Sequence, residues 1–213
     1  MKTYLLDFDG TMVDSMPEFV WLMKKILDDN NVSYGDNLMK IITPLGYEGT
    51  AEYFSKIGVK GTKEEILNTI NEYAFYVYKE KIPAKKNVIS VLKELKARGV
   101  SLNILSASPK NLVLICLERL GISGVFDNIW SSDDFNIPKN NPEIYLETSK
   151  KLGVEVRDVF FFDDNVNAAK AAKKAGMKVC GVYDDSSSEF TDELKQISDF
   201  FVYDFKEILE IKE

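Results

Sequence analysis

Pairs of acidic residues follow two apolar runs of the chain, and they are the residues best suited to chemistry. Asp7 and Asp9 follow the run Tyr-Leu-Leu, and Asp163 and Asp164 follow three phenylalanines. Carboxylates two residues apart point the same way where the backbone stays extended, and Gly10 then lets the chain turn sharply. For Asp7 and Asp9, a solvated strand end with an Asx turn is the alternative interpretation. A helix cap could explain one of the two adjacent acids Asp163 and Asp164, but not both. Paired carboxylates can perform acid–base work or hold an oxygen-seeking cation.

A serine closes a third apolar run, in the stretch Ser106-Ala107-Ser108-Pro109. A serine just before a helix caps its first turn, or it joins backbone N–H groups in holding an anion. Both interpretations stay open from these residues alone. Lys139 precedes the stretch Asn-Asn-Pro-Glu, and as one lysine among many it carries no signal by itself.

The composition excludes several kinds of site. The chain has no histidine, so a His-based triad, a His-ligated zinc site and an imidazole base are all impossible. With 27 basic and 34 acidic residues, it carries a net charge of −7, which gives no footprint for nucleic acid or an anionic membrane. Cys116 and Cys180 lie in apolar runs and are expected to be buried, inert thiols.

The N-terminal sequence has too short an apolar stretch for a signal peptide, and no apolar run reaches the ~20 residues that span a bilayer. We therefore expect a cytoplasmic protein that binds neither membrane nor nucleic acid. We expect it to be a monomer or a weak homodimer.

Short β-rich runs alternate with helical patterns, which predicts an α/β fold with a doubly wound, Rossmann-like parallel sheet covered by helices. The predicted strands are Thr3–Phe8, Val100–Leu105, Asn128–Ser131, Asp158–Phe162, Lys178–Tyr183 and Phe200–Tyr203. The predicted core helices are Asn87–Arg98, Pro109–Leu120, Pro142–Leu152 and Asn165–Ala175, each followed by a glycine. A last strand and helix are expected over Asp192–Glu213.

A stretch with no convincing strand interrupts this alternation. Residues 15–81 show helical patterns near 16–30, 36–43, 49–57 and 62–81, which indicates an inserted α-helical cap domain. The catalytic core is then formed by residues 1–14 and 82–213. In an open parallel sheet, sites form at the carboxyl ends of the strands, where the acidic pairs and Ser106 are expected to lie.

Taken together, these motifs resemble those of the haloacid dehalogenase superfamily. The chain has Asp-Phe-Asp-Gly-Thr near its start, then the serine, then Lys139 before Asn-Pro-Glu-Ile-Tyr, and finally Phe-Phe-Phe-Asp-Asp. The four motifs occur in the superfamily's order and cover residues 7 to 164. The helical insert resembles the superfamily's cap. The stretch Asp-Gly-Thr-Met-Val-Asp-Ser is similar to that of phosphoglycolate-phosphatase-like members, and Leu-Ser-Ala-Ser resembles that of their β-phosphoglucomutase relatives.

The resemblance implies a role for each matched residue. Asp7 would be the nucleophile that forms an aspartyl-phosphate, and Asp9 the general acid and base. The implied metal is Mg²⁺, held by the side chains of Asp7 and Asp163 and by the backbone carbonyl of Asp9. The implied phosphate site consists of Gly10, Thr11, Ser106, Ala107 and Lys139. Because many relatives carry Gly-Asp where this chain has Asp163-Asp164, a direct contact of Asp164 or Asn167 with the metal stays open.

The implied reaction is Mg²⁺-dependent hydrolysis of a small phosphomonoester, such as a phosphorylated metabolite. The alternative is a hexose-phosphate mutase with the same aspartyl-phosphate chemistry, and a phospho-accepting signalling module is a remote one. Dehalogenation is disfavoured, because relatives that displace halide lack an acid at the position of Asp9. Thr43–Thr50 resembles a cap loop that reaches the substrate, so Gly46, Tyr47 and Thr50 are candidate substrate contacts or parts of a plain turn.

Overall fold

The computed structural model describes residues 2–211, which divide into two compact units. One unit contains the chain up to Asp14 together with the chain from Pro83 onward, and Ser15–Ile82 form the other. Residue 82 thus belongs to the inserted unit, whereas the sequence predicted it in the core.

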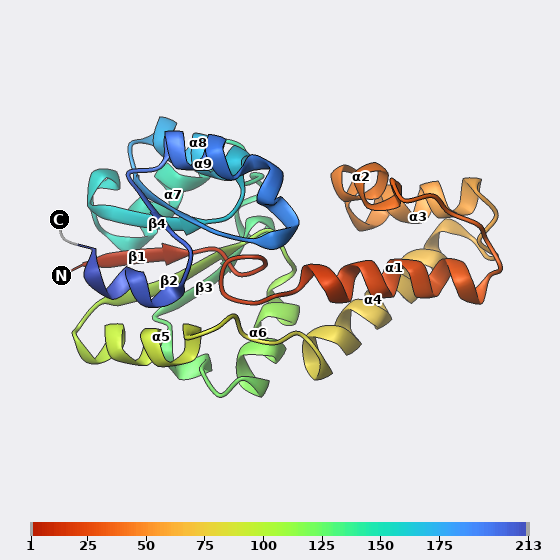
Figure 1. Cartoon of the computed structure of the whole chain (residues 1–213), viewed down its shortest axis with the longest axis horizontal. Coiled ribbons are helices and arrows are strands. Elements are labelled where there is room, and N and C mark those ends of the chain that lie inside the picture. Colours follow the sequence, from red (N-terminus) through yellow and green to blue (C-terminus); the bar gives the residue numbers. More distant parts are fainter. Residues whose placement is uncertain (1, 212–213) are drawn as a thin grey trace. The chain divides into compact units, whose positions relative to one another are not determined.

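The first unit contains a six-stranded parallel sheet in the order β3-β2-β1-β4-β5-β6. Figure 1 labels the strands from β1 to β4. The strands are β1 (Thr3–Leu6), β2 (Ser101–Ser106), β3 (Asn128–Ser131), β4 (Val159–Asp163), β5 (Lys178–Val182) and β6 (Phe200–Val202). This arrangement confirms the predicted doubly wound fold. Strand β1 ends two residues before its predicted end, because the backbone after Asp7 turns back on itself, with Met12 and Val13 both donating to the Phe8 carbonyl.

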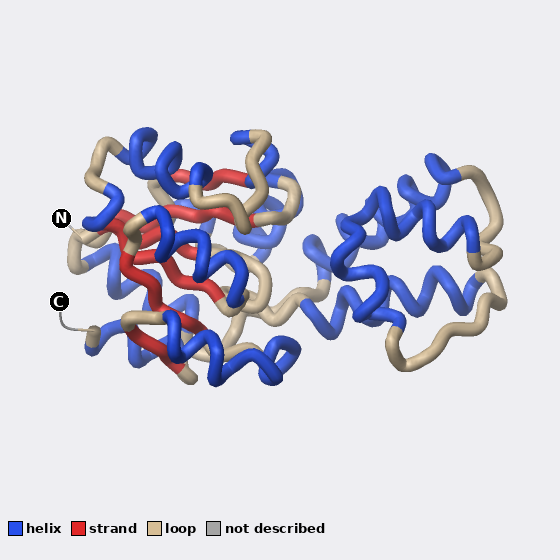
Figure 2. The backbone as a smooth tube through the Cα atoms, turned by 90° about the horizontal axis from the view of Figure 1, so that it is seen from above, coloured by secondary structure: helices blue, strands red, loops and turns tan. Residues whose placement is uncertain are grey.

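Helices cover both faces of this sheet (Figure 2). They are α5 (Val88–Ala97), α6 (Lys110–Arg119), α7 (Glu143–Leu152), α8 (Val166–Ala175) and α9 (Thr191–Ile197). Phe161 of β4 and Val179 of β5 are buried in a hydrophobic core that also contains Ile144 of α7 and Ala169 of α8. Phe160 and Phe162, which alternate with Phe161 and face the other side of the sheet, are also buried. The sheet is therefore apolar on both sides, as expected for parallel strands under helices.

Glycines in the left-handed region end two of these helices, as predicted. Gly153 after α7 has φ +69°, and Gly176 after α8 has φ +100°. The expected last strand is β6, and the helix that follows it, Phe205–Glu210, is a 3₁₀ helix. Asp204 begins it with a reciprocal capping box to Glu207.

The second unit contains only helices in the part that the structure describes. They are α1 (Met16–Asp29), α2 (Leu38–Ile42), α3 (Gly46–Lys56) and α4 (Lys63–Glu80), with a 3₁₀ turn at Thr43–Leu45. Its interior includes Leu22, Ile26, Phe54, Ile70 and Tyr78, all of which are buried. Helix α3 begins at Gly46, three residues earlier than predicted, so much of the predicted cap loop is helical.

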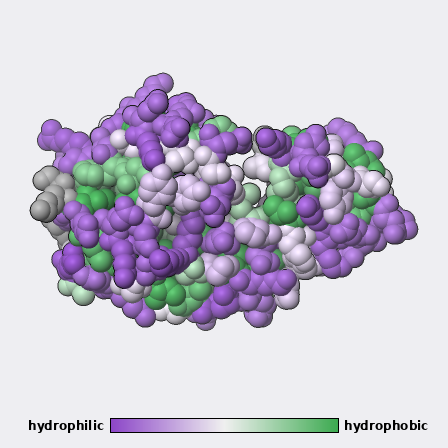
Figure 3. All heavy atoms as spheres, in the orientation of Figure 1, coloured by the Kyte–Doolittle hydropathy of each residue, from purple (hydrophilic) through white to green (hydrophobic). Residues whose placement is uncertain are grey.

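Most of the surface seen in Figure 3 is hydrophilic. Cys116 and Cys180 are buried and not in a disulfide, as predicted, and burial raises the pKa of the Cys116 thiol to about 11. No helix between residues 2 and 211 has the length and apolar character needed to cross a membrane.

Candidate active site

Asp7 and Asp163 meet because β1 and β4 are neighbouring parallel strands. Leu6 pairs with Phe162 in the register, and the Asp7 N–H donates to the Phe162 carbonyl at 2.9 Å. The residues that follow these partners therefore lie side by side at the carboxyl edge of the sheet. The order and register of the strands thus bring together two residues that are 156 positions apart in the sequence.

Three carboxylates form a compact acidic cluster at this edge. Asp7, Asp163 and Asp164 each offer an oxygen within 4.8 Å of the others. As whole residues they are 6%, 0% and 9% exposed, so water screens their charges poorly. A cluster of this kind needs a positive partner to stay ionised.

Lys139 is one such partner and lies on the loop before α7. Its ammonium group contacts Asp7 Oδ1 and lies 2.7 Å from Asp163 Oδ2. The Tyr145 hydroxyl donates to the Lys139 carbonyl at 2.8 Å, which fixes the backbone of this loop. Burial alone would lower the pKa of Lys139, but the carboxylates of Asp163 and Asp7 outweigh it and the pKa rises. Lys139 is thus a permanent cation in the site.

The charge of Lys139 does not balance the cluster. Burial, together with the carboxylates of Asp163 and Asp9, raises the pKa of Asp7 from 3.8 to about 7 despite Lys139. Burial, Asp163 and Asp7 also raise the pKa of Asp164 well above its usual value. The site therefore has more negative charge than Lys139 neutralises, and its carboxylate oxygens lie close enough together to bind one ion. These properties fit a divalent cation such as Mg²⁺.

Asp9 follows Asp7 on the turn after β1, and it is half-buried. Its carboxylate accepts a hydrogen bond of 2.7 Å from the Ser108 hydroxyl. The hydroxyl of Ser106, at the end of β2, accepts from the Ser108 N–H at 3.0 Å. Ser106 is buried, and Pro109 occupies the N-cap position of α6, so Ser106 does not cap this helix. Ser108 thereby joins the strand end of Ser106 to Asp9.

Gly10 and Thr11 pack against Asp164. The Thr11 hydroxyl donates to Asp164 Oδ1 at 3.0 Å and accepts from the Asp164 N–H at 3.2 Å. Gly10 has φ +79°, and a Cβ added there would lie 2.7 Å from both Asp164 carboxylate oxygens. Only glycine lets the backbone pass this close. The structure thus gives both residues a clear role in holding Asp164, whereas their predicted phosphate contacts stay predictions.

Asn165 carries the capping function that the sequence left open for the acids. Its side chain accepts from the Asn167 N–H at 2.9 Å and from the Ala168 N–H at 3.3 Å at the start of α8. Asp163 accepts from the Asn165 N–H at 2.7 Å. Asp164 is therefore not needed as a cap. The Asn167 side chain is exposed on the first turn of α8.

The remaining predicted residues are placed as follows. Ala107 is exposed on the turn between Ser106 and Ser108. Gly46, Tyr47 and Thr50 lie on the first turns of α3 in the second unit. Thr50 is buried and donates to the Ile42 carbonyl at 3.3 Å, and the Tyr47 ring lies 6.4 Å from the Phe19 ring. Their predicted substrate contacts stay predictions.

Sequence reasoning missed Ser108, because nothing in Ser-Ala-Ser-Pro indicated which serine would turn toward Asp9. It also missed Lys85 and Asp184, which contact each other at 2.8 Å. Both are recognisable only once the carboxyl end of β5 is placed beside the turn after β1.

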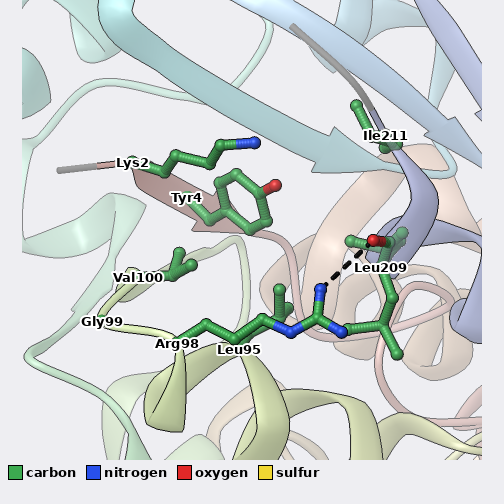
Figure 4. A pocket seen from close by; sticks show the side chains of 9 residues that line it. Lys2, Tyr4, Leu95, Arg98, Gly99, Val100, Leu209 and Ile211 are labelled. Carbon is green, nitrogen blue, oxygen red and sulfur yellow. Dashed lines mark hydrogen bonds between the residues drawn. The ribbon is translucent and has the colours of Figure 1, made fainter.

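A separate hollow of about 230 Å³ lies at the amino ends of β1 and β2 (Figure 4). Tyr4, Val100 and Arg98 are among its lining residues, and Arg98 donates to the Leu209 carbonyl. Because the strands are parallel, the hollow at their amino ends lies on the opposite side of the sheet from the acidic cluster at their carboxyl ends. It contains none of the predicted site residues.

Comparison of the sequence with known families agrees with the fold and with the acidic cluster. Residues 4–182 match the model of the haloacid dehalogenase-like hydrolases, so the chain belongs to this family. The predicted resemblance is thereby confirmed.

Individual relatives are similar over most of the chain. YhcW of Bacillus subtilis is 30% identical over 180 residues, which cover 84% of this chain and 81% of that protein. The phosphoglycolate phosphatase of Aquifex aeolicus is 28% identical, covering 84% and 83% of the two chains. The phosphorylated carbohydrates phosphatase of Thermotoga maritima is 25% identical over similar shares, 84% and 83%.

Solved structures share the fold. The structure of CbbY from Rhodobacter sphaeroides in complex with phosphate superimposes with a TM-score of 0.81 at 18% identity. It covers 98% of this chain, which in turn covers 96% of it. At this identity the likeness concerns the architecture alone.

Proposed function

We propose that this protein is a Mg²⁺-dependent phosphatase that hydrolyses a small phosphomonoester through an aspartyl-phosphate on Asp7. The observation that carries the proposal is the position of Asp7, whose carboxylate is buried at a strand end beside Asp163, Asp164 and Lys139. Asp9 follows two residues later, where an acid can serve the leaving group.

Asp7 is the residue that attacks phosphorus. A buried carboxylate has lost most of its hydration, so little solvent must be removed before it approaches the phosphoryl group. A new Asp7 Oδ–P bond forms as the bond from phosphorus to the leaving oxygen breaks. Lys139 offsets the repulsion between the carboxylate and the phosphoryl oxygens.

Asp9 acts as the general acid and then as the general base. In the first step its carboxyl gives a proton to the departing alkoxide, and in the second it takes one from the water that attacks the phosphoenzyme. The Ser108 hydrogen bond at 2.7 Å orients the Asp9 carboxylate for both tasks. This arrangement performs acid–base catalysis in a chain that has no histidine.

The metal site consists of Asp7, Asp163 and Asp164, with the Asp9 carbonyl as a further ligand. When bound, Mg²⁺ supplies positive charge that neutralises the carboxylates and the phosphoryl oxygens. The raised pKa values of Asp7 and Asp164 support this assignment, since these acids are held together without enough positive charge.

The substrate class is a small phosphorylated metabolite. This follows from the names of similar proteins, which include a phosphatase of phosphorylated carbohydrates and one of phosphoglycolate. The cap sequence, residues 15–81, has no arginine, and all three arginines of the chain lie in the α/β core domain. The cap therefore lacks a planar fork with which to hold a second phosphate.

The test is the release of inorganic phosphate from a panel of sugar phosphates, phosphoglycolate and an aryl phosphate, with Mg²⁺ and with EDTA. We expect Mg²⁺-dependent release by the wild type and none by Asp7→Asn. Asp158→Asn is the matched control, because Asp158 is exposed just before β4, at the opposite end from Asp163. Release that survives Asp7→Asn would refute the nucleophile.

Absence of release from the whole panel would refute the phosphatase. In that case a coupled isomerisation assay with a sugar bisphosphate tests the mutase, which uses the same Asp7 chemistry but returns the phosphoryl group to the sugar.

A further inference from the structure

Lys85 occupies a cradle of three oxygens next to the catalytic turn. Its ammonium group contacts the Gly10 carbonyl, and it lies 2.7 Å from the Tyr183 carbonyl and 2.8 Å from Asp184 Oδ2. An ammonium group has three N–H donors, so this cradle uses its full capacity. Lys85 thereby joins the turn after β1 to the end of β5.

The backbone of Lys85 holds the same turn at a second point. The Lys85 N–H donates to the Met12 carbonyl at 2.9 Å, and the Asp14 N–H donates to the Pro83 carbonyl at 3.0 Å. Within the turn, the Gly10 N–H donates to the Val13 carbonyl at 2.9 Å. Lys85 therefore fixes the segment that carries Asp9, Gly10 and Thr11 at two points. Its side chain binds the Gly10 carbonyl, and its backbone N–H binds the Met12 carbonyl.

The ion pair of Lys85 and Asp184 is largely buried, unlike the ion pairs that lie on a protein surface. The Lys85 side chain is 19% exposed and that of Asp184 only 3%. A buried pair contributes little to stability compared with apolar residues of similar volume, because both ions lose their hydration. What such a pair provides well is a defined geometry, since its hydrogen bonds have few alternatives.

The position of Gly10 determines the position of two site residues. Its carbonyl is the atom that Lys85 binds, and its Cα lies against the Asp164 carboxylate. Asp9 precedes it directly, and Thr11, which binds Asp164, follows it. A shift of the Gly10 peptide would therefore move the acid–base residue and the metal-site carboxylate together.

We propose that Lys85 is a positioning residue for the reaction, and that its ammonium group, bound by Gly10, Tyr183 and Asp184, fixes the turn that carries Asp9 and Thr11. It does not touch the reacting atoms. This inference rests on the proposed function for its catalytic readout. The oxygen cradle also makes a chemical prediction, because it is built to bind a small cation that donates N–H bonds.

The test removes the tethered ammonium and supplies a free one. Lys85→Ala leaves the three oxygens in place, and a pocket of about 400 Å³ that Lys85, Thr11, Tyr183 and Asp184 help to line gives access to them. We expect kcat to fall about 10- to 100-fold, as for other small misplacements of catalytic groups. KM should change little, since the loss concerns the transition state.

Methylammonium or ethylammonium should restore kcat of Lys85→Ala in a saturable way. Tetramethylammonium at the same ionic strength should not, because it has no N–H donor. A variant whose kcat equals that of the wild type would overturn the proposal, and so would a loss of kcat that no amine relieves in a folded protein. If Lys85→Ala does not fold, Lys85→Met keeps the apolar stem and should show the same loss of kcat.

Lys86→Ala is the matched control. Lys86 is the next residue, its side chain is 84% exposed, and its partner is Asp204 at 3.3 Å. This variant should keep the kcat of the wild type and should not respond to amines. An equal loss of activity in Lys86→Ala would mean that the whole segment matters and that the cradle has no special role.

Amide hydrogen exchange gives a readout that needs no substrate. In Lys85→Ala, the peptide that spans Phe8–Asp14 should exchange faster than in the wild type, while the strands stay protected, and an amine should slow it again. If the wild type has no phosphatase activity but this exchange pattern holds, the proposed function fails and the positioning role stands. If exchange in this peptide is unchanged, the positioning role fails, whatever the activity.

Discussion

Lys139 binds Asp163 at 2.7 Å while contacting Asp7, and so bridges the ends of two neighbouring strands with one ammonium group. Its side chain is 10% exposed, and those of Asp7 and Asp163 are 8% and 1% exposed. A single cation thus lies between the residue that we propose as the nucleophile and a residue that we propose as a metal ligand.

Replacing Lys139 should remove activity with limited damage to the fold. Lys139→Met keeps the apolar stem but leaves buried carboxylates without this partner. We expect kcat to fall about 10²- to 10³-fold, the usual effect of losing one group that stabilises developing charge. Circular dichroism and steady-state kinetics would show this, and a variant with full activity would exclude Lys139 from the reaction.

Two glycines allow the close approach at Asp164 to be separated from backbone strain. Gly10 and Gly99 have almost the same φ, +79° and +80°, but an added Cβ meets Asp164 only at Gly10 and meets nothing within 4 Å at Gly99. Gly99→Ala should cost about 1–2 kcal/mol from the left-handed backbone alone. Gly10→Ala should cost about 1–3 kcal/mol more from the clash.

Urea unfolding of both variants measures that difference, and Mg²⁺ titration adds a functional readout. We expect weaker Mg²⁺ binding in Gly10→Ala only. Equal unfolding free energies for the two variants would show that Gly10 and Asp164 are not in contact.

Loss of the Ser108 hydroxyl should affect Asp9 specifically. Ser108→Ala removes the 2.7 Å hydrogen bond to the Asp9 carboxylate and keeps the backbone N–H that Ser106 accepts from. We expect kcat to fall about tenfold with little change in KM, since the contribution of a positioned acid–base group is about 10²- to 10⁴-fold. Unchanged kcat would show that Asp9 needs no support from Ser108.

The raised pKa of Asp7 predicts how stability depends on pH. Its pKa rises from 3.8 to about 7 on folding, so the folded state binds this proton more tightly than the unfolded chain does. The resulting stabilisation is complete below pH 3.8 and is lost as the pH rises through about 7. The metal-free protein should therefore lose this contribution between weakly acidic and neutral pH.

Mg²⁺ should reverse the trend, because it binds the ionised carboxylates and competes with protons. The rise in Tm on adding Mg²⁺ should be larger at about pH 8 than at about pH 5. Asp7→Asn, which cannot ionise at this position, should show a smaller dependence of that rise on pH. A rise that is independent of pH in the wild type would contradict the assignment of Asp7 to the metal site.

Much of the fold could be predicted because its signals are local. Apolar runs such as Phe160–Phe162 marked the strands, and glycines such as Gly153 and Gly176 marked helix ends. The convergence of Asp7 with Asp163 followed once both were placed at carboxyl ends of parallel strands, since such ends share one edge.

Other parts of the site depend on long-range geometry that periodicity does not encode. Lys139 lies on a loop, and only the family resemblance distinguished it from the other lysines. No sequence pattern around Asp184 indicates that it is buried, yet it is 4% exposed. Its carboxylate is paired with the Lys85 ammonium group, which comes from a segment 99 positions earlier in the chain.

The most direct test of the central proposal is to detect the covalent intermediate on Asp7. The protein would be mixed with a substrate found in the phosphate-release panel and Mg²⁺, quenched in acid within the first turnover, digested and analysed by mass spectrometry. We predict phosphate on the peptide that contains Asp7, absent in Asp7→Asn and in wild type treated with EDTA. Turnover without any phosphate on Asp7, or with phosphate on another residue, would contradict the proposed mechanism.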